Sequence, residues 1–430
     1  MTDAILRLLS GWLPRQRWFA GAEGHVELRV LEDRVFASDV GAEARVVIVR
    51  DDASTPPVVY QVPVVFRPAT DAGDDPALIG HTGDGRALYD GPHDAAFTDA
   101  LLRAVAPDAA AAHAQVLRGE QSNTSIVYQL DTGHPIICKV FRRLSDGLNP
   151  DIELQSALAA QGSRHVPNVV GVVDGTWQSP ANPAQRATGS LAFAQEFFPG
   201  VEDAWRVALR AADAGEDFSP GAEALGRATA EVHLNLARLF PTTLAGTHER
   251  STTTEAWARR LAEALDVVPA LRVHEPAIRA RYAAAEAASW PRLQRIHGDY
   301  HLGQVLQVPE RGWVLLDFEG EPLRPMSERR TPDLAARDVA GMLRSFDYVA
   351  GSLALTAGTG ERGGDAVRWA TSARTAFLAG YRAVSPVDPS GPLLDALELD
   401  KAVYEAVYEA RHRPGWVSIP LTAIDLILAR

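Results

Sequence analysis

The sequence predicts an α+β protein in which strands come first and helices follow. Up to about residue 200, short β-type apolar runs alternate with Gly, Asp and Pro, which is typical of strands and turns. Beyond that point the apolar residues recur at helical spacing. A chain of 430 residues is also too long for one small core, so we expect several subdomains.

The first part, residues 1–89, is predicted to be a small sheet with one flanking helix. An amphipathic pattern over residues 3–12 predicts the helix. Three β-type runs follow at 26–31, 44–49 and 58–66. The polar, Gly- and Asp-rich residues 69–91 are predicted to form a loop or linker.

The second part, residues 90–200, is predicted to contain a helix at 93–105 followed by strands. The strand at 136–141 carries Lys139, and a charge inside an apolar strand requires a partner. Glu153, near the predicted start of the next helix, is the expected partner. A lysine held by a helix glutamate can grip phosphate oxygens.

A polar loop between two strands precedes this lysine and contains Ser122, Asn123 and Thr124. The backbone amides of such a loop can cover phosphates, although an ordinary hairpin turn has the same composition. Farther on, an apolar strand that begins at Leu191 runs through Gln195, Glu196 and Phe198 into a turn.

The third part, residues 201–430, is predicted to be mostly helical. Apolar periodicity predicts helices at 218–240, 254–267, 276–287, 337–349 and 396–413. Pro414 ends the last of them. Asp338, near the start of the fourth, either buttresses a catalytic loop through hydrogen bonds or simply favours the N-terminus of its helix.

The segment 296–322 carries the strongest chemical pattern of the chain. It has His297-Gly298-Asp299, then Gln304, then a short apolar strand that ends in Asp317-Phe318-Glu319. This order suits phosphoryl transfer, with Asp299 beside the attacking hydroxyl and with Gln304, Asp317 and Glu319 as ligands of a divalent metal. The alternative is a solvated hairpin with incidental acids.

The last predicted helix carries residues that suit a sugar site. Lys401, Tyr404 and Tyr408 share one face, Glu405 lies beside them, and Trp416 follows the proline. Aromatic faces cover the apolar side of a pyranose ring, while charged groups bind its hydroxyls. An amphipathic helix with half-buried tyrosines would explain the same pattern equally well.

The composition excludes several classes of partner. The formal net charge of −13 argues against nucleic acid, because phosphate-backbone binding requires a basic face. One cysteine permits no internal disulfide and fits a reducing cytoplasm. No secretory leader and no apolar run of about 18 residues is evident, so we expect a cytoplasmic protein without membrane contact.

The segment 296–322 resembles the catalytic segment of the aminoglycoside phosphotransferase and choline kinase branch of protein-kinase-like enzymes. Gln304 stands where that branch usually has Asn, and Glu319 where a second Asp is common. The resemblance implies a bilobal protein-kinase-like fold that uses ATP and Mg²⁺. It also implies that the segment with Gln195, Glu196 and Phe198 is the hinge that reads adenine.

Patches along nearly the whole chain resemble actinobacterial maltokinases. They are LPRQRWFAG from Leu13, YQVP from Tyr60, CKVFRR from Cys138, HGDYHLGQVL, DFEGEP, DKAVYE from Asp400 and RPGW from Arg413. The resemblance implies an N-terminal cap subdomain and phosphorylation of maltose by ATP at the anomeric hydroxyl, in the service of α-glucan synthesis. It assigns the sugar to His297, Lys401, Tyr404, Glu405, Tyr408 and Trp416.

Two other functions compete with maltose phosphorylation. One is a kinase of another sugar or amino sugar, such as glucosamine, although Lys401 favours a neutral sugar. The other is an inactive kinase-like protein that binds enzymes of α-glucan metabolism, although Lys139, Asp299 and Asp317 are all present. Partnership with such enzymes is also conceivable for an active kinase.

Overall fold

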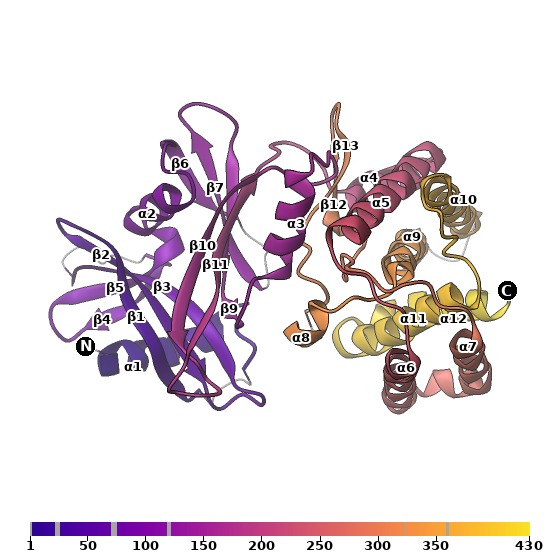
Figure 1. The fold of residues 1–430 in the computed structure, drawn as a ribbon, viewed down its shortest axis with the longest axis horizontal. Helices are drawn as coiled ribbons and strands as arrows, with labels where there is room; N and C mark the ends of the chain where they lie inside the picture. Colours follow the sequence, from indigo (N-terminus) through magenta and orange to yellow (C-terminus); the bar gives the residue numbers. More distant parts are fainter. Residues whose placement is uncertain (1, 22–25, 70–74, 118–121, 323, 358–360) are drawn as a thin grey trace. The chain divides into compact units, whose positions relative to one another are not determined.

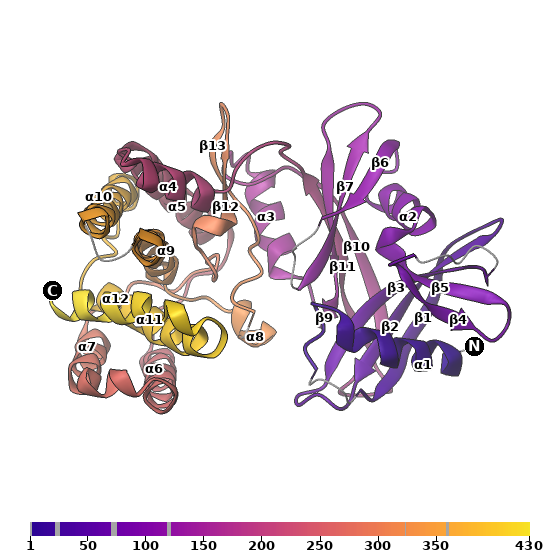
Figure 2. The same cartoon turned by 180° about the vertical axis from the view of Figure 1, so that it is seen from behind.

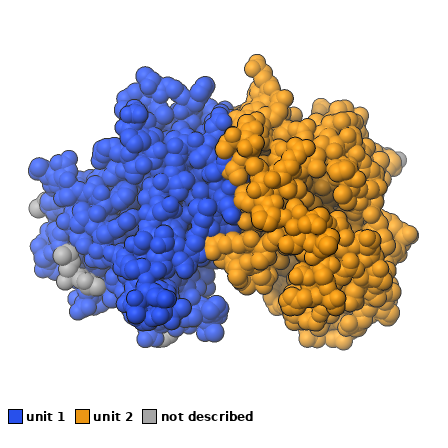
Figure 3. Space-filling model, in the orientation of Figure 1, with its two compact units in different colours: residues 1–156, 167–199 blue, residues 157–166, 200–430 orange. Residues whose placement is uncertain are grey.

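A computed structural model describes residues 2–21, 26–69, 75–117, 122–322, 324–357 and 361–430. The strands of two sheets are concentrated before residue 200 and the helices after it (Figures 1 and 2). The chain divides into two compact units (Figure 3): unit 1 comprises Met1–Ser156 and Pro167–Pro199, and unit 2 comprises Ala157–Val166 and Gly200–Arg430. The predicted α+β class is confirmed.

The first sheet of unit 1 is antiparallel, in the order β1-β2-β3-β5-β4. Its strands are β1 (Leu28–Asp39), β2 (Ala42–Asp51), β3 (Val58–Pro68), β4 (Leu78–Thr82) and β5 (Arg86–Asp90). Helix α1 (Thr2–Trp12) packs on this sheet. Ile5 and Leu9 of α1 are buried in one cluster with alternate residues of β2 and β3. The buried positions therefore follow the i, i+4 spacing of a helix face in α1 and the two-residue alternation of a strand face in β2 and β3.

The loop predicted at 69–91 was wrong in its second half, because β4 and β5 form a hairpin there. The two strands pair from Leu78↔Tyr89 to Thr82↔Arg86. Ala77, Ala87 and Tyr89 bury a small apolar cluster of their own. Each strand has only five residues, and the polar, Gly-rich composition conceals the short alternation that pairing requires.

The second sheet of unit 1 is also antiparallel, in the order β10-β11-β8-β7-β6. Its strands are β6 (Ala111–Val116), β7 (Asn123–Leu130), β8 (Ile136–Phe141), β10 (Val169–Gln178) and β11 (Arg186–Glu196), with helices α2 (Ala95–Val105) and α3 (Pro150–Ala160) and the short β9 (Arg143–Leu144), which pairs with β3 of the first sheet. Residues of both sheets and of α2 share one buried cluster. The division at residue 89 remains a prediction.

Unit 2 is helical except for one hairpin. Its elements are α4 (Ala204–Ala214), α5 (Ser219–Leu239), α6 (Thr247–Val267), α7 (Glu275–Ala287), β12 (Val305–Val308), β13 (Gly312–Leu315), α8 (Met326–Arg329), α9 (Ala335–Ala357), α10 (Glu361–Val384), α11 (Pro392–His412) and α12 (Ser418–Leu428). Helices α5 and α10 approach closely, since a Cβ on Gly226 would lie 2.0 Å from the carbonyl oxygen of Phe377. Among the described residues, no helix has both the length and the hydrophobicity needed to cross a bilayer.

Candidate active site

Two turns of unit 2 hold the acids of the central segment, and they lie against each other. A Cβ on Gly298 would lie 3.2 Å from the Cα of Gly320, so the first turn requires glycine both for this approach and for its φ of +86°. His297 Nε2 donates to the carbonyl of Leu316 at 2.8 Å. The turn with Asp299 is thereby joined to the strand end before Asp317.

The His297 ring lies within this connection rather than against open space. The residue is 2% exposed, and its ring centroid lies 4.7 Å from that of Phe318. We had assigned His297 to the sugar. Its contacts in the structure are those of a residue that positions Asp299 and Asp317.

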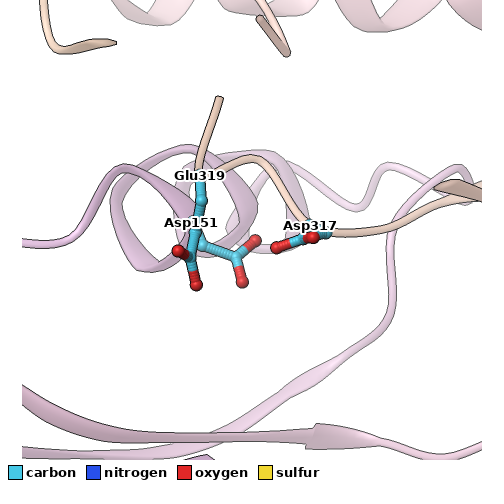
Figure 4. A group of neighbouring side chains, drawn as sticks. All are labelled: Asp151, Asp317 and Glu319. Carbon is cyan, nitrogen blue, oxygen red and sulfur yellow. The ribbon is translucent and has the colours of Figure 1, made fainter. Parts of the chain in front are cut away.

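The predicted metal ligands gather on the same two turns. Gln304 Nε2 donates to Asp317 Oδ2 at 3.1 Å, and Glu319 follows Asp317 on the segment after β13 (Figure 4). Asp317 has a φ of +65°, a left-handed conformation that is strained for a non-glycine residue and concentrates at functional sites. Two carboxylates and an amide oxygen are the donors that Mg²⁺ prefers, so this set fits the metal.

Asp338, at the start of α9, anchors the turn that leads to Asp299. It is 1% exposed and accepts hydrogen bonds from the backbone nitrogens of His297, at 2.8 Å, and Gly298, at 2.9 Å. His233 Nε2 donates to the same carboxylate at 3.0 Å. The first of our two interpretations of Asp338, a buttress of the catalytic loop, is confirmed.

Asp299 lines a cavity of about 690 Å³ inside unit 2, together with Lys401 and Tyr404 of α11. Lys401 Nζ lies 3.7 Å from Asp299 Oδ1 and 3.3 Å from Glu321 Oε1. The same ammonium lies 5.2 Å from the centroid of the Tyr404 ring, close enough for a cation–π contact. The volume is within the range of small-molecule sites.

The charges around this cavity are mainly acidic. Its lining contains the carboxylates of Glu249, Asp299, Glu321, Glu328, Asp333, Asp338 and Asp400, and the cations Arg259, Arg260, Arg324, Arg337 and Lys401, for a formal charge of −2. Burial lowers the pKa of Lys401, but Glu321 and Asp299 more than compensate and raise it above its usual value. Lys401 therefore stays cationic, and its charge is already shared by two carboxylates.

The other residues predicted for the sugar on α11 and beyond do not line this cavity. Glu405 Oε2 instead accepts from the buried Arg344, at 2.7 Å from Nη2. Tyr408 is 40% exposed and stacks on His412, with ring centroids 4.5 Å apart. Trp416 packs against Arg413, whose guanidinium carbon lies 4.6 Å from its ring.

The strand lysine of unit 1 has a carboxylate partner on α3 that we did not name from the sequence. Lys139 Nζ donates to Asp151 Oδ2 at 2.8 Å. We had named Glu153 for this ion pair. Asp151 lies in the first turn of α3, two positions before Glu153, and the pairing of Lys139 with Glu153 stays a prediction.

The remaining residues predicted for the nucleotide lie at the ends of strands in the second sheet. Gln195 and Glu196 end β11 and pair with the first residues of β8; Phe198 follows them. Asn123 and Thr124 begin β7, directly after Ser122, while residues 118–121 of the predicted phosphate loop lie outside the described residues.

Sequence reasoning missed several residues of the cavity wall. Arg260 binds Asp400 through two hydrogen bonds of 2.7 and 2.6 Å, and Arg337 bonds Asp333 at 2.9 Å. Glu321 was not singled out, although it follows the metal-binding motif by two residues. Only Glu321 and Asp400, the neighbour of Lys401, had a signal in the sequence through their proximity to predicted site residues.

Two family models match the chain. A maltokinase N-terminal cap domain matches residues 12–94, and a phosphotransferase enzyme family matches residues 113–370. A glucosamine kinase of Mycolicibacterium smegmatis is 30% identical over 348 residues, which are 73% of this chain and 81% of that protein. A glucosamine kinase of Streptacidiphilus jiangxiensis is 30% identical over 308 residues, 66% of each chain.

Solved structures of glucosamine kinase have the same fold. One, in complex with glucosamine, ADP and inorganic phosphate, superposes with a TM-score of 0.68 at 25% identity and covers 98% of both chains. A second crystal form gives a TM-score of 0.71 at 23% identity over 99% of both chains. The kinase-like fold with an N-terminal cap is thus confirmed. With more than half of its length matched by the family model, this chain belongs to the phosphotransferase enzyme family.

Proposed function

We propose that this phosphotransferase transfers the γ-phosphoryl group of ATP to a hydroxyl group of glucosamine or a closely related amino sugar. The observation that carries the proposal is the acidic cavity around Asp299, in which the one lysine is already neutralised. The relatives named glucosamine kinase, one of them with glucosamine and ADP bound, support the same choice of substrates.

The ion pairs of Lys401 with Asp299 and Glu321 change how its charge affects the binding of an amino sugar. An unpaired ammonium beside Asp299 would repel an amino sugar, which is why we first took Lys401 to favour a neutral one. Glu321 and Asp299 both lie within 4 Å of its Nζ, so the local charge is negative. A cavity with surplus carboxylates attracts a cationic sugar more strongly than its neutral counterpart.

Each group of site residues has a different role in the proposed phosphoryl transfer. Asp299 orients the attacking hydroxyl and accepts its proton, and Lys401 keeps the Asp299 carboxylate in place. Gln304, Asp317 and Glu319 would hold Mg²⁺, which neutralises phosphate charge when bound. On unit 1, Lys139 binds phosphate oxygens from its contact with Asp151; Ser122, Asn123 and Thr124 belong to the loop over the phosphates, and the hinge with Gln195, Glu196 and Phe198 binds adenine.

Maltose is the second candidate acceptor, phosphorylated at its anomeric hydroxyl. The match to a maltokinase N-terminal cap over residues 12–94 favours it. A disaccharide would also give Tyr408 and Trp416 a role, because its second ring could extend beyond the cavity toward the exposed end of α11.

A panel of acceptors with ATP and Mg²⁺, followed by ADP release, tests the proposal. Glucosamine and glucose are matched, since they differ only in the amino group. We expect kcat/KM for glucosamine to exceed that for glucose by at least about tenfold, one charge-assisted hydrogen bond. Turnover of maltose with glucosamine inert would favour the second candidate, and no turnover of any sugar would contradict both.

Two tyrosines one helical turn apart on α11 offer a matched pair of variants. Tyr404 lines the cavity and Tyr408 does not. We expect Tyr404→Ala to raise the KM for glucosamine about tenfold with little change in the KM for ATP, through the loss of one packed aromatic contact. Tyr408→Ala is expected to leave both constants within about twofold. A larger effect of Tyr408→Ala than of Tyr404→Ala would place the sugar at the exposed end of α11.

The metal assignment is tested by Asp317→Asn, which keeps the shape of the side chain and removes its charge. We expect the Mg²⁺ concentration for half-maximal activity to rise at least about tenfold, because a neutral amide oxygen binds a hard cation less tightly than a carboxylate does. Paramagnetic resonance of added Mn²⁺ measures the same loss without turnover. An unchanged metal requirement would remove Asp317 from the ligand set.

A further inference from the structure

Unit 1 contains a cavity of about 910 Å³ that shares only Asn123 and Thr124 with the residues of the proposed function. Its wall is built from the segment after α1, the start of α2, strand β6 and the beginning of β7. The charged side chains in this wall are those of Arg15, Arg17, Asp90, His93, Asp94, Asp99, His113 and Arg142.

The cavity lies on the face of the second sheet that is opposite to Lys139. Strand side chains alternate between faces, and Cys138 and Val140, the neighbours of Lys139, belong to the buried cluster that includes α2. Thr124 pairs with Val140 across the ladder and therefore shares that face. Arg142 Nε donates to Thr124 Oγ1 at 2.8 Å, so both of these lining residues are on the α2 side.

The wall has hydrogen-bond donors without acceptors. The Arg142 side chain is 1% exposed; its Nη2 donates to both oxygens of Asp90 at 3.0 and 3.1 Å, but its Nη1 has no hydrogen-bond partner among the described residues. The Trp18 ring covers this guanidinium, with a distance of 4.7 Å to the ring centroid. The exposed Arg15 and Arg17 make no side-chain hydrogen bond or ion pair to any residue that the structure describes.

The acids of the wall are largely occupied by other partners. Asp90 is bound by Arg142. Asp94 is bound by Arg67, at 2.6 and 2.7 Å, and caps α2 through the backbone nitrogen of Ala96. Of the lining carboxylates, Asp99 is left to balance Arg15, Arg17 and the Nη1 of Arg142. Buried donors normally find an acceptor, which the Nη1 of Arg142 lacks, and the exposed Arg15 and Arg17 add positive charge to the same wall, so we take the wall to suit an anionic ligand.

We infer that this cavity binds a small phosphate monoester. The guanidinium groups of Arg15 and Arg17 have no carboxylate partners, and their two positive charges match a phosphate dianion. The planar N–H pairs of a guanidinium also match the spacing of phosphate oxygens. The volume exceeds what a bare phosphate needs and leaves room for a sugar-sized group. Arg142 also binds Thr124 of the predicted phosphate loop, so the ligand would influence nucleotide binding. This last step rests on the proposed function, whereas binding of the ligand itself does not.

Calorimetric titration of the full chain with glucose 6-phosphate, in the presence of excess ADP and glucosamine to occupy the proposed nucleotide and sugar sites, tests the inference. We expect binding of the phosphate ester and none of glucose. The double variant Arg15→Gln/Arg17→Gln is expected to raise Kd at least about tenfold, or 1.4 kcal/mol. The control Arg7→Gln/Arg103→Gln removes the same charge from exposed arginines outside the cavity and is expected to leave Kd within about twofold.

Each result of this titration either supports or contradicts the binding of a phosphate monoester in this cavity. Binding of inorganic phosphate alongside the ester would support an anion site with little contribution from the sugar. Absence of binding, equal binding of glucose, or equal weakening in both double variants would overturn the inference, the last because it would reflect net charge alone. Because no step requires turnover, failure to phosphorylate any sugar would contradict the proposed function and leave this result standing.

Discussion

Replacement of Asp299 by Asn is expected to lower kcat by about 10²–10⁴-fold, the usual contribution of a positioned general base. Asn keeps the size of the side chain and one oxygen, but it cannot accept the proton of the attacking hydroxyl. The substitution also weakens the 3.7 Å contact with Lys401, because Lys401 stays charged while the Asn side chain is neutral. Steady-state ADP release at saturating sugar and ATP measures the loss.

The fold and the nucleotide site serve as controls for this variant. Thermal melting and calorimetric binding of ADP should match those of the unmodified protein, because Asp299 has no part in the core. Glu321→Gln is a matched variant, since it removes a carboxylate from the other side of Lys401 while leaving the general base intact. Near-normal turnover by Asp299→Asn would remove Asp299 from the catalytic role.

Replacement of Asp338 by Ala is expected to be the most destabilising single change near the site. It would leave the buried backbone N–H groups of His297 and Gly298, and the ring of His233, without their acceptor. Each unsatisfied buried group costs about 1–3 kcal/mol, so we expect a loss of at least about 3 kcal/mol in the free energy of unfolding. A displaced catalytic turn should also reduce kcat about 10²-fold.

Ser345→Ala provides a graded control on the same helix. Ser345 Oγ accepts one hydrogen bond, from the backbone nitrogen of Leu302 at 3.1 Å, so its removal should cost only about 1 kcal/mol. Urea denaturation gives the two free energies, and hydrogen exchange of residues 296–304 shows whether the loss is local. If the two variants were equally stable, the hydrogen bonds to Asp338 would not be what holds the turn.

The amino sugar proposed here differs from the maltose implied by resemblance, and the difference has a physical origin. The residues shared with maltokinases lie in the predicted phosphoryl-transfer site and in the cap. Kinases of different sugars can have both of these parts in common. In the proposed function, the sugar is selected instead by the charge that surrounds Asp299. That charge depends on the pairing of Lys401 with Glu321, residues 80 positions apart in the chain.

The sequence alone was sufficient for the α+β class, the helical second half and the order of the chemical groups from Lys139 to Asp317. These features depend on local periodicity and on short turns, whose conformation is determined by neighbouring residues. The same locality brings Gln304 and Asp317 within 3.1 Å through a short hairpin, while their role as metal ligands stays a prediction.

Only the tertiary structure decided which acid meets Lys139, which residues of α11 face the cavity, and that residues 78–90 pair as a hairpin. Each depends on the angle at which one element packs on another. The cavity behind the second sheet likewise has walls from five separate segments. No local pattern in the chain encodes such a convergence, because it arises from packing between residues that are distant in sequence.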